Sequence, residues 1–411
     1  MKRLLTKYLE SYRGFSKAIW ILSFGAFINS FGMMVTTFLA LYLSDQLHFS
    51  VIQTGNILAA YGAGYLAGGY FGGKLCDKID PRKILIASLS LTGMGYLILP
   101  FAHSFHAILA LMFLVGTVES FFRPAYNVTL ARCAPQKIRT RAWSLYYILI
   151  NAGIAVGSVS GGFLAQKHFA YVCWVDGVTS LLAALLYIFF RHSMLFLPTT
   201  KISEKTKNHR SPWSHISFLI FCGLTFGTSL VFFQIKSTYP LYLNGFYHLS
   251  FKSFGFLMML NGLLIILFEV PLLKWLERFR NLHVAGVGSL LLCGGFALLP
   301  FGTTSAFAIL CILISTLGEM LLFPTSIGLV MSMSHEKRQG EFMGLYQTVY
   351  SLSYMLAPIL GTILYERFSP NVLWYCCGVL GIFSLFGFFN FLNDIKEVSS
   401  DVPLSTPPPI S

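Results

Sequence analysis

The chain has 411 residues, of which 55% are hydrophobic and only 11% are charged, and its formal net charge is +13. Soluble globular proteins carry about 25% charged residues, so this composition excludes a soluble globular protein and indicates an integral membrane protein. The positive charge does not indicate a nucleic-acid-binding protein, because its distribution follows a membrane topology instead.

About twelve apolar runs have the length of roughly twenty residues that a helix needs to cross the hydrocarbon of a bilayer. They start near residues 18, 51, 82, 105, 142, 170, 215, 253, 283, 305, 342 and 371. The first run, Ala18 to Leu43, is too long for the apolar core of a signal peptide, so we expect a retained helix there. The sequence therefore predicts an all-α polytopic membrane protein with twelve transmembrane helices.

The basic residues are concentrated in the alternate loops that share a side of the membrane with the N-terminus. Only Lys167, Lys252 and Arg367 lie in loops on the other side, and Arg123 and Lys236 lie within helices, which leaves 24 of the 29 basic residues on the first side. This positive-inside asymmetry predicts that both termini and the central loop are cytoplasmic. We expect a multi-pass protein of the plasma membrane, which in a bacterium is the inner membrane.

A long polar segment, RHSMLFLPTTKISEKTKNHRSPW at 191–213, divides the apolar runs into two sets of six. Its Lys, Ser, Thr and Pro content is typical of a flexible linker. We therefore expect an N-terminal six-helix bundle over 1–190, a cytoplasmic linker over 191–214 and a C-terminal six-helix bundle over 215–395. The remaining residues, 396–411, are expected to form a disordered cytoplasmic tail.

The two halves are related to one another at a constant offset of 200 residues. LYL at 41–43 matches LYL at 241–243, LPF at 99–101 matches LPF at 299–301, and Trp174 matches Trp374. Two equivalent bundles imply a pseudo-two-fold axis along the membrane normal, with a ligand site at mid-membrane between them.

The turn after the second apolar run reads GKLCDKIDPRKI at 73–84, and its repeat is LKWLERFRN at 273–281. Motif, loop position and repeat register together resemble transporters of the major facilitator superfamily, and the resemblance covers the whole chain. The resemblance implies two pseudo-symmetric six-helix bundles and is closest to the drug/proton antiporter branch. The positions that match the family's cytoplasmic gate motif are Gly73, Asp77, Lys78, Arg82 and Lys83 in the first half and Glu277 and Arg278 in the second.

Within this motif, Asp77 has two interpretations. Its carboxylate can accept the free amide donors at the start of a helix from the other half, and the eleventh helix, which begins near Gly340, is the natural partner. Such a contact would hold the cytoplasmic side shut. The alternative is a solvated loop charge. Asp80 and Pro81 depart from the family pattern, which leaves the geometry of this turn open.

The fifth apolar run carries NAGIAVGSVSGG at 151–162, which resembles the glycine-proline motif of the family's antiporters. Ser158 stands where the family has proline, and Pro358 supplies a proline at the repeat-related position. Small residues at this spacing allow helices to approach closely. The helix-packing motif is expected at Gly153, Gly157, Gly161, Gly162 and Pro358, with plain close packing as the alternative to a role in antiport.

Several charges lie within apolar runs, in GTVESFFRPAYN at 116–127 and in LGEMLLFPTS at 317–326. Burying such a charge costs roughly 2.5–3.5 kcal/mol on insertion scales, so these residues usually face the bundle interior and find partners. Glu119 and Arg123 are four apart and are predicted to pair directly on one helix face. The resemblance implies that the fourth and tenth helices line the central cavity, so Glu119 and Glu319 should face one another across it.

Glu319 has no basic residue within one helical turn, so we expect it to be the proton carrier. The Glu119–Arg123 pair is expected either to bind a substrate anion or to position the helix. Lys236 is expected to bind an anionic group, to pair with Asp176 or to reach the outer interface. Glu269 is assigned to the intracellular gate. Uncharged candidates for the cavity wall are Asn29, Tyr146, Tyr147, Asn151, Gln234, Tyr346, Gln347 and Tyr350.

The favoured function is a secondary active transporter that works by alternating access and exports small lipophilic or cationic compounds in exchange for protons. The runner-up is a proton-coupled importer of an amino acid, sugar or nucleoside, with Arg123 or Lys236 as the anion ligand. A non-transporting receptor and an intramembrane enzyme are further alternatives, but the histidines lie in loops or near helix ends.

We assign no catalytic residues, no metal site and no cofactor. The expected partners are a small-molecule substrate, protons and the lipid bilayer, with no nucleic acid, and we expect a monomer.

Overall fold

The computed structural model describes residues 14–193, 211–335 and 338–391. Most of the expected linker and the expected C-terminal tail lie outside these residues. The helices of the first half are α2 (Lys17–Gly32), α3 (Val35–Leu41), α4 (Val51–Lys78), α5 (Pro81–Ile98), α6 (Phe105–Glu119), α7 (Phe122–Cys133), α8 (Gln136–Lys167) and α9 (Phe169–Phe189). Those of the second half are α10 (Ile216–Phe232), α11 (Thr238–Tyr247), α12 (Phe251–Leu276), α13 (Asn281–Ala297), α14 (Ser305–Met333), α15 (Gln339–Arg367) and α16 (Pro370–Phe386).

Eleven spans of the described chain are long and apolar enough to cross a membrane, which confirms a polytopic all-α fold. The first of them, Lys17–Gln46, joins α2, α3 and a π-helical turn, and Phe105–Cys133 joins α6 and α7. The twelfth expected span is α4, which is 28 residues long but rich in glycine and tyrosine, so its hydropathy is lower. At 1.5 Å per residue, a helix of this length reaches across a bilayer.

Helix starts recur at repeat-related positions because the capping residues recur in the sequence. Ser50 and Gln53 form a capping box at the start of α4, and Ser250 accepts the amide of Ser253 at the start of α12. The residues two positions earlier, His48 and His248, both have positive φ angles, of 54° and 52°. A side-chain oxygen that accepts an amide hydrogen at this place satisfies a donor that the helix cannot satisfy itself.

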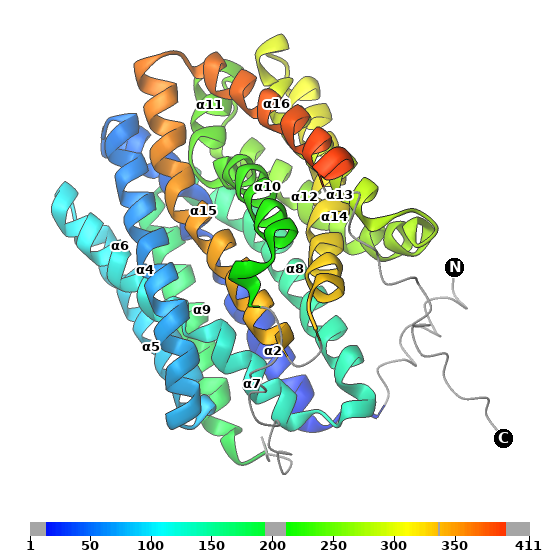
Figure 1. Cartoon of the computed structure of the whole chain (residues 1–411). Coiled ribbons are helices and arrows are strands. Elements are labelled where there is room, and N and C mark those ends of the chain that lie inside the picture. The colour runs from blue at the N-terminus through cyan, green and yellow to red at the C-terminus, as the bar shows by residue number, and fades with distance from the viewer. Residues whose placement is uncertain (1–13, 194–210, 336–337, 392–411) are drawn as a thin grey trace, which may run out of the picture.

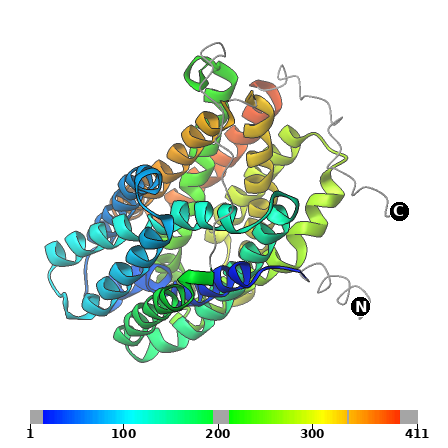
Figure 2. The same cartoon turned by 90° about the horizontal axis from the view of Figure 1, so that it is seen from below.

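The two halves lie beside each other and cross along two seams. In the first seam, α15 lies beside α4, as Figure 1 shows, and in the second seam α8 lies beside α12. Seen from below, the elements of the first and second halves form two neighbouring groups (Figure 2). The side of the molecule that carries the turn between α4 and α5, with Lys78 and Lys83, is called the basic side below, and the other the opposite side.

On the opposite side, the helix ends of the two halves contact each other. Ile52 donates its amide to the Glu366 carboxylate at 2.7 Å, and the Phe38 ring packs edge-on against Phe254 with centroids 5.7 Å apart. On the basic side, a side chain added at Gly73, near the end of α4, or at Gly340, at the start of α15, would meet no atom within 4 Å. The structure is therefore closed on the opposite side, while Gly73 and Gly340 face open space.

Candidate functional site

A cavity of about 270 Å³ lies at the middle of α14 and the second half of α12. Its lining combines two carboxylates with aromatic and apolar side chains, contributed by α8, α12 and α14: Tyr147, Ile265, Glu269, Glu319, Met320, Phe323, Pro324 and Ile327. None of these residues carries a positive charge. A space of this size with this lining suits a small organic cation, since carboxylates attract the charge and aromatic faces stabilise it.

Glu319 is half-buried on α14 and is held by a side chain of α12. Asn261 donates its amide to the Glu319 carboxylate at 2.9 Å and to the Thr316 hydroxyl, also at 2.9 Å. Thr316 in turn donates to the carbonyl of Ile312 at 2.7 Å. This chain of hydrogen bonds fixes one oxygen of Glu319 and leaves the residue on the cavity wall.

Glu269 lines the same cavity as Glu319, although the sequence had assigned it to the intracellular gate. The Tyr147 hydroxyl of α8 donates to its carboxylate at a long 3.4 Å. Because α8 belongs to the first half and α12 to the second, this hydrogen bond crosses between the halves. Seven residues of α12 separate Glu269 from Asn261, and the fold places Glu269 and Glu319 on the wall of one cavity, which the sequence did not indicate.

The predicted Glu119–Arg123 pair is wrong. The segment is not one continuous helix: α6 ends at Glu119 and α7 begins at Phe122. Pro124 has no amide hydrogen to donate to the carbonyl of Ser120, so the hydrogen-bond ladder is interrupted there. Glu119 instead accepts a hydrogen bond of 2.7 Å from the Tyr96 hydroxyl of α5 and interacts with the Tyr61 hydroxyl of α4.

Arg123 is exposed on α7 and forms no ion pair with a described carboxylate. Its neighbours are tyrosines from both halves, and Tyr65 of α4 lies within electrostatic reach of its guanidinium group. Tyr146, Tyr147 and Tyr350 also lie within electrostatic reach of its guanidinium group. The arrangement brings α4, α7 and α8 of the first half to α15 of the second around one cation.

Lys236 and Asp176 do not pair with each other in the structure. Lys236, in the turn Phe233–Lys236 that follows α10, donates to the Thr37 hydroxyl of α3 at 2.9 Å and thereby bridges the halves. Asp176 of α9 is 2% exposed and accepts the amide of Val35 at 3.1 Å. It thus caps α3 at the break between α2 and α3.

The uncharged residues expected on the cavity wall mostly make contacts within or between helices. Asn29 accepts from the Ser180 hydroxyl at 3.3 Å, and Asn151 donates to the carbonyl of Tyr147 in its own helix. Gln234 is buried and donates to the carbonyl of Ala357 at 2.9 Å. Tyr146 stacks on Tyr126, Tyr346 is buried against Phe221, and Gln347 is half-buried on α15.

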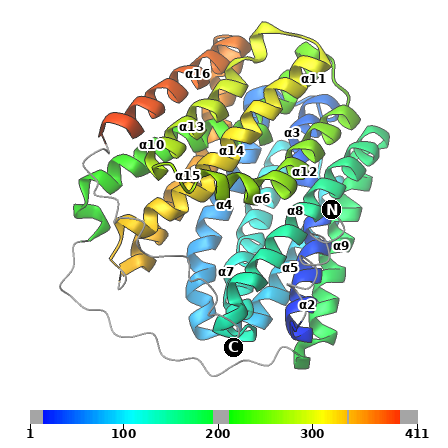
Figure 3. The same ribbon diagram turned by 90° about the vertical axis from the view of Figure 1, so that its right-hand side faces the viewer.

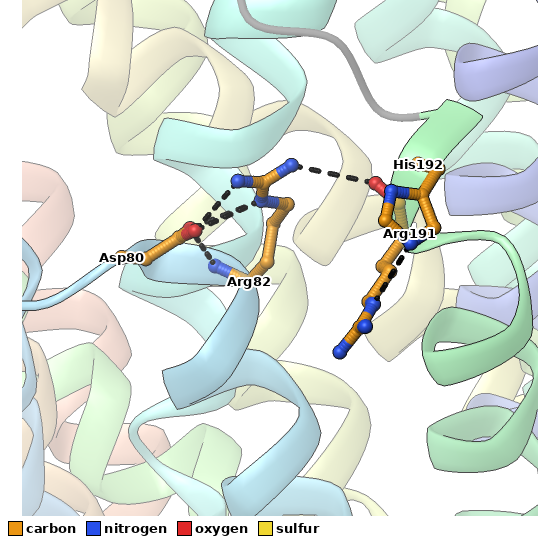
Figure 4. Close-up of polar contacts among 4 residues, drawn as sticks. All are labelled: Asp80, Arg82, Arg191 and His192. Carbon is orange, nitrogen blue, oxygen red and sulfur yellow. Dashed lines mark hydrogen bonds and ion pairs between the residues drawn. The ribbon is translucent and has the colours of Figure 1, made fainter.

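The turn of the gate motif is built around Asp80 and Arg82 (Figure 4). Asp80 caps α5 by accepting the Arg82 amide at 3.0 Å, Pro81 occupies the first helical position, and the Arg82 guanidinium pairs with Asp80 at 2.6 Å. Arg82 also donates to the carbonyl of Arg191 at 3.3 Å. Asp80 and Pro81, which depart from the family pattern, are therefore residues that favour the start of a helix at the positions where they stand.

The predicted latch between Asp77 and the eleventh helix is not formed. Asp77, Lys78 and Lys83 are exposed, and no hydrogen bond or ion pair links Asp77 to the described start of α15. The physical reason is that the helix ends of the two halves meet on the opposite side, far from this turn. In the second half, Glu277 is exposed and Arg278 lies over the Trp275 ring at 4.2 Å.

The glycines of α8 lie against three neighbouring helices, α2, α3 and α12. Gly153 and Gly157 approach the backbone of α2 at Phe27 and Phe31, and Gly161 approaches Met34 and Phe38. Gly162 instead faces Phe251 and Lys252 at the start of α12, in the other half. In the first seam, the carbonyl of Pro358 lies against Gly55 of α4.

Sequence reasoning missed Asn261 and Tyr96, the two side chains that hold Glu319 and Glu119. One signal was available: Asn261 stands at the repeat position of Tyr61, which also interacts with the repeat-related glutamate. Two polar side chains in the same register, each opposite a buried carboxylate, mark an interhelical contact.

The chain matches a family model described as Major Facilitator Superfamily over residues 22–357 and 221–407. It is 25% identical to "Uncharacterized MFS-type transporter YttB" of Bacillus subtilis, over 87% of this chain and 90% of that protein. It is 22% identical to a Na(+), Li(+), K(+)/H(+) antiporter of Planococcus maritimus, over 81% and 86%. It is 23% identical to multidrug resistance protein MdtH of Aeromonas hydrophila, over 88% and 92%.

A likeness to solved structures extends over nearly the whole chain. A transporter of the POT family crystallised with 5-aminolevulinic acid is 14% identical, with a TM-score of 0.81, and the match covers 94% of this chain and 98% of that one. At this identity the likeness establishes the fold.

Proposed function

The chain belongs to the Major Facilitator Superfamily, and we propose that it is a proton-coupled antiporter that exports small lipophilic cations. Members of this family are secondary transporters and not enzymes, so the chain is a multi-pass membrane protein that moves a small molecule. The substrate, the direction and the coupling ion are the proposed part.

One observation carries the proposal: the cavity between α8, α12 and α14 has two carboxylates and no basic residue in its lining. A carboxylate on such a wall has two competing ligands, an organic cation and a proton. Exchange of one for the other on opposite sides of the membrane gives antiport. Tyr147 and Phe323 add aromatic surface, and a cation over an aromatic face gains about 0.5–2 kcal/mol.

The names of two relatives support the proposal of a proton-coupled antiporter. The names of MdtH and of the Planococcus maritimus protein describe multidrug resistance and cation/proton antiport, respectively, for those proteins. We propose the same kind of substrate for this chain, a cationic or drug-like compound, and the same coupling ion, the proton, because the acidic cavity suits both. In this mechanism Glu319 is the proton carrier, and Asn261 orients it.

The second candidate function is proton-coupled import of a small polar metabolite with a carboxylate. It is favoured by Arg123, which is exposed among four tyrosines and forms no ion pair with a described carboxylate. A guanidinium group in this position suits a substrate carboxylate, which it binds through two parallel hydrogen bonds.

Proton flux in inverted vesicles under an imposed pH gradient separates these functions. A panel of lipophilic cations, amino acids and sugars is added to vesicles with wild type, Glu319→Gln, Glu269→Gln or Asp45→Asn. We expect a lipophilic cation to discharge the gradient in wild type and in Asp45→Asn, because Asp45 is exposed outside the cavity. Glu319→Gln should reduce this proton release at least tenfold, and Glu269→Gln should weaken the apparent affinity for the cation.

If Glu319→Gln showed the same cation-driven proton flux as wild type, Glu319 would not be the proton carrier. A wild type that responds to amino acids and not to cations would favour the importer, and Arg123→Gln should then abolish that response.

A further inference from the structure

An apolar groove of about 460 Å³ lies between α12 and α14 of the second half. The ribbons of these two helices lie beside each other in Figure 3. All of its lining residues are apolar: Leu264, Phe268, Pro271, Leu272, Leu313, Leu317 and Met320. Phe268 is 53% and Leu317 is 38% exposed. The groove lies in the middle of α14 and the half of α12 nearer the basic side, at a depth where the surroundings of a membrane protein are hydrocarbon.

The corresponding helices of the first half, α4 and α6, are repeats of α12 and α14 but pack against each other through glycines. Offset by 200 residues, Leu264, Phe268 and Leu272 correspond to Gly64, Gly68 and Gly72 of α4. A side chain added at Gly64 would strike the carbonyl of Phe113, and one added at Gly68 would strike the carbonyl of Thr117. The glycines therefore let α4 and α6 close on each other.

In the second half, side chains replace those three glycines. Leu264 and Phe268 project from α12 where α4 has only hydrogen atoms, so α12 cannot approach α14 as α4 approaches α6. Side-chain volume at these positions thus keeps a groove open that the glycines close in the first half. The groove follows from the sequence of the second repeat and is not a general property of the two-bundle arrangement.

Met320 lines both this groove and the carboxylate cavity, and it is 5% exposed. It follows Glu319 directly in α14. A methionine side chain is unbranched and changes rotamer readily, so it can seal a boundary and still move aside. Met320 is therefore shared by the wall of the apolar groove and the wall of the carboxylate cavity.

We propose that this groove is a lateral access path from the bilayer, in which the apolar tail of a membrane-dissolved organic cation lies while its charged head reaches Glu269 and Glu319. This proposal rests on the proposed function, because the cavity must accept cations. Met320 is the gate between tail groove and head cavity. The chemistry matches at both ends: seven apolar residues line the groove, and carboxylates lie beyond the gate.

The experiment compares two cations with the same head and different tails, dodecyltrimethylammonium and butyltrimethylammonium, in proteoliposomes. Leu317→Trp places an indole in the mouth of the groove, and Met320→Ala removes most of the gate. Leu310→Trp is the matched control, because Leu310 is 46% exposed on the same helix and does not line the groove.

We expect Leu317→Trp to reduce dodecyltrimethylammonium transport at least fivefold and to leave butyltrimethylammonium transport unchanged. Leu310→Trp should behave as wild type with both. Met320→Ala should raise the rate for the long-tailed cation, an effect opposite to that of a folding defect. Equal effects of Leu317→Trp on both cations, or none on the long one, would overturn the lateral path while leaving the cation site in place. If wild type transported neither cation, the proposed function would fail, and the lateral path with it.

Discussion

Glu119 and Glu319 occupy the same position in the two repeats but meet different partners. Glu119 is held by the hydroxyls of two tyrosines, Tyr96 and Tyr61, whereas Glu319 is held by the amide of Asn261. Glu319 lines a cavity, and Glu119 does not line that cavity. The sequence located both carboxylates correctly within apolar runs but gave Glu119 the wrong partner, because the interruption before Pro124 separates it from Arg123.

The cap at Asp80 gives a prediction at the residue scale. Partial burial raises the pKa of Asp80, but the hydrogen bonds and the positive charge of Arg82 outweigh burial and hold that pKa below its ordinary value. Asp80→Ala should cost about 1 kcal/mol of stability at pH 7, since it removes a helix cap. Asp80→Asn keeps a capping side chain and loses the charge, so it should cost less.

Thermal unfolding in detergent at several pH values tests this prediction. A depressed pKa means that the charged form contributes stability above the ordinary pKa of about 4, and that this contribution is lost as the pH falls through the lower folded-state value. The gap between wild type and Asp80→Asn should therefore close in acid. A gap that widens on acidification would contradict the role of the Asp80–Arg82 pair.

At the scale of elements, the positions of the helices could be predicted and their interruptions could not. Apolar runs and capping residues are local, so α4, α12 and α14 begin close to where the sequence places them. The break between α2 and α3 depends on Asp176, whose carboxylate caps Val35 from 141 residues away. A proline alone does not predict an interruption either. Pro124 follows a break between α6 and α7, whereas Pro324 at the repeat-related position lies inside the continuous α14.

The glycine seam between α4 and α6 gives a prediction at this scale. Gly64→Ala should destabilise the protein by about 1–3 kcal/mol, because its added methyl group would overlap the carbonyl of Phe113 and the backbone must shift. Gly73→Ala is the matched control on the same helix, where no atom lies within 4 Å. Its unfolding midpoint should equal or slightly exceed that of wild type, because alanine favours a helix over glycine. Equal losses in the two variants would show that helix flexibility, and not close packing, is what these glycines provide.

At the scale of the whole molecule, the helix ends of the two halves are held together on the opposite side. The sequence alone identifies the two repeats, through their constant offset of 200 residues, and the family, through the motif at 73–84. It could not indicate which side is closed, since the same sequence must support both conformations of a transporter. For the same reason the Asp77 latch remains a prediction for the conformation that this structure does not show.

Cross-linking tests the closed side directly. In a background without the eight native cysteines, Ile52→Cys with Glu366→Cys should form a disulfide without added substrate, because the hydrogen bond between the Ile52 amide and the Glu366 carboxylate holds the start of α4 against the end of α15. The bridge should abolish transport, and a reductant should restore it. Asp77→Cys with Gly340→Cys is the matched pair on the basic side and should stay reduced. Preferential cross-linking of that second pair would contradict the closure seen here.

Few polar contacts hold the opposite side closed, and their number affects the equilibrium between the conformation closed on that side and the conformation open there. Lys236–Thr37 and Ile52–Glu366 both involve a charged group, and hydrogen bonds of this kind contribute about 1.5–3 kcal/mol each. Moving a two-state equilibrium from 1:99 to 99:1 takes about 5.5 kcal/mol, which is comparable with the sum of two such contacts. Apparent affinity scales with the occupied fraction of the competent state. Weakening Lys236–Thr37 should therefore lower the affinity for a ligand offered on the basic side and raise it on the other, although neither residue lines the ligand cavity.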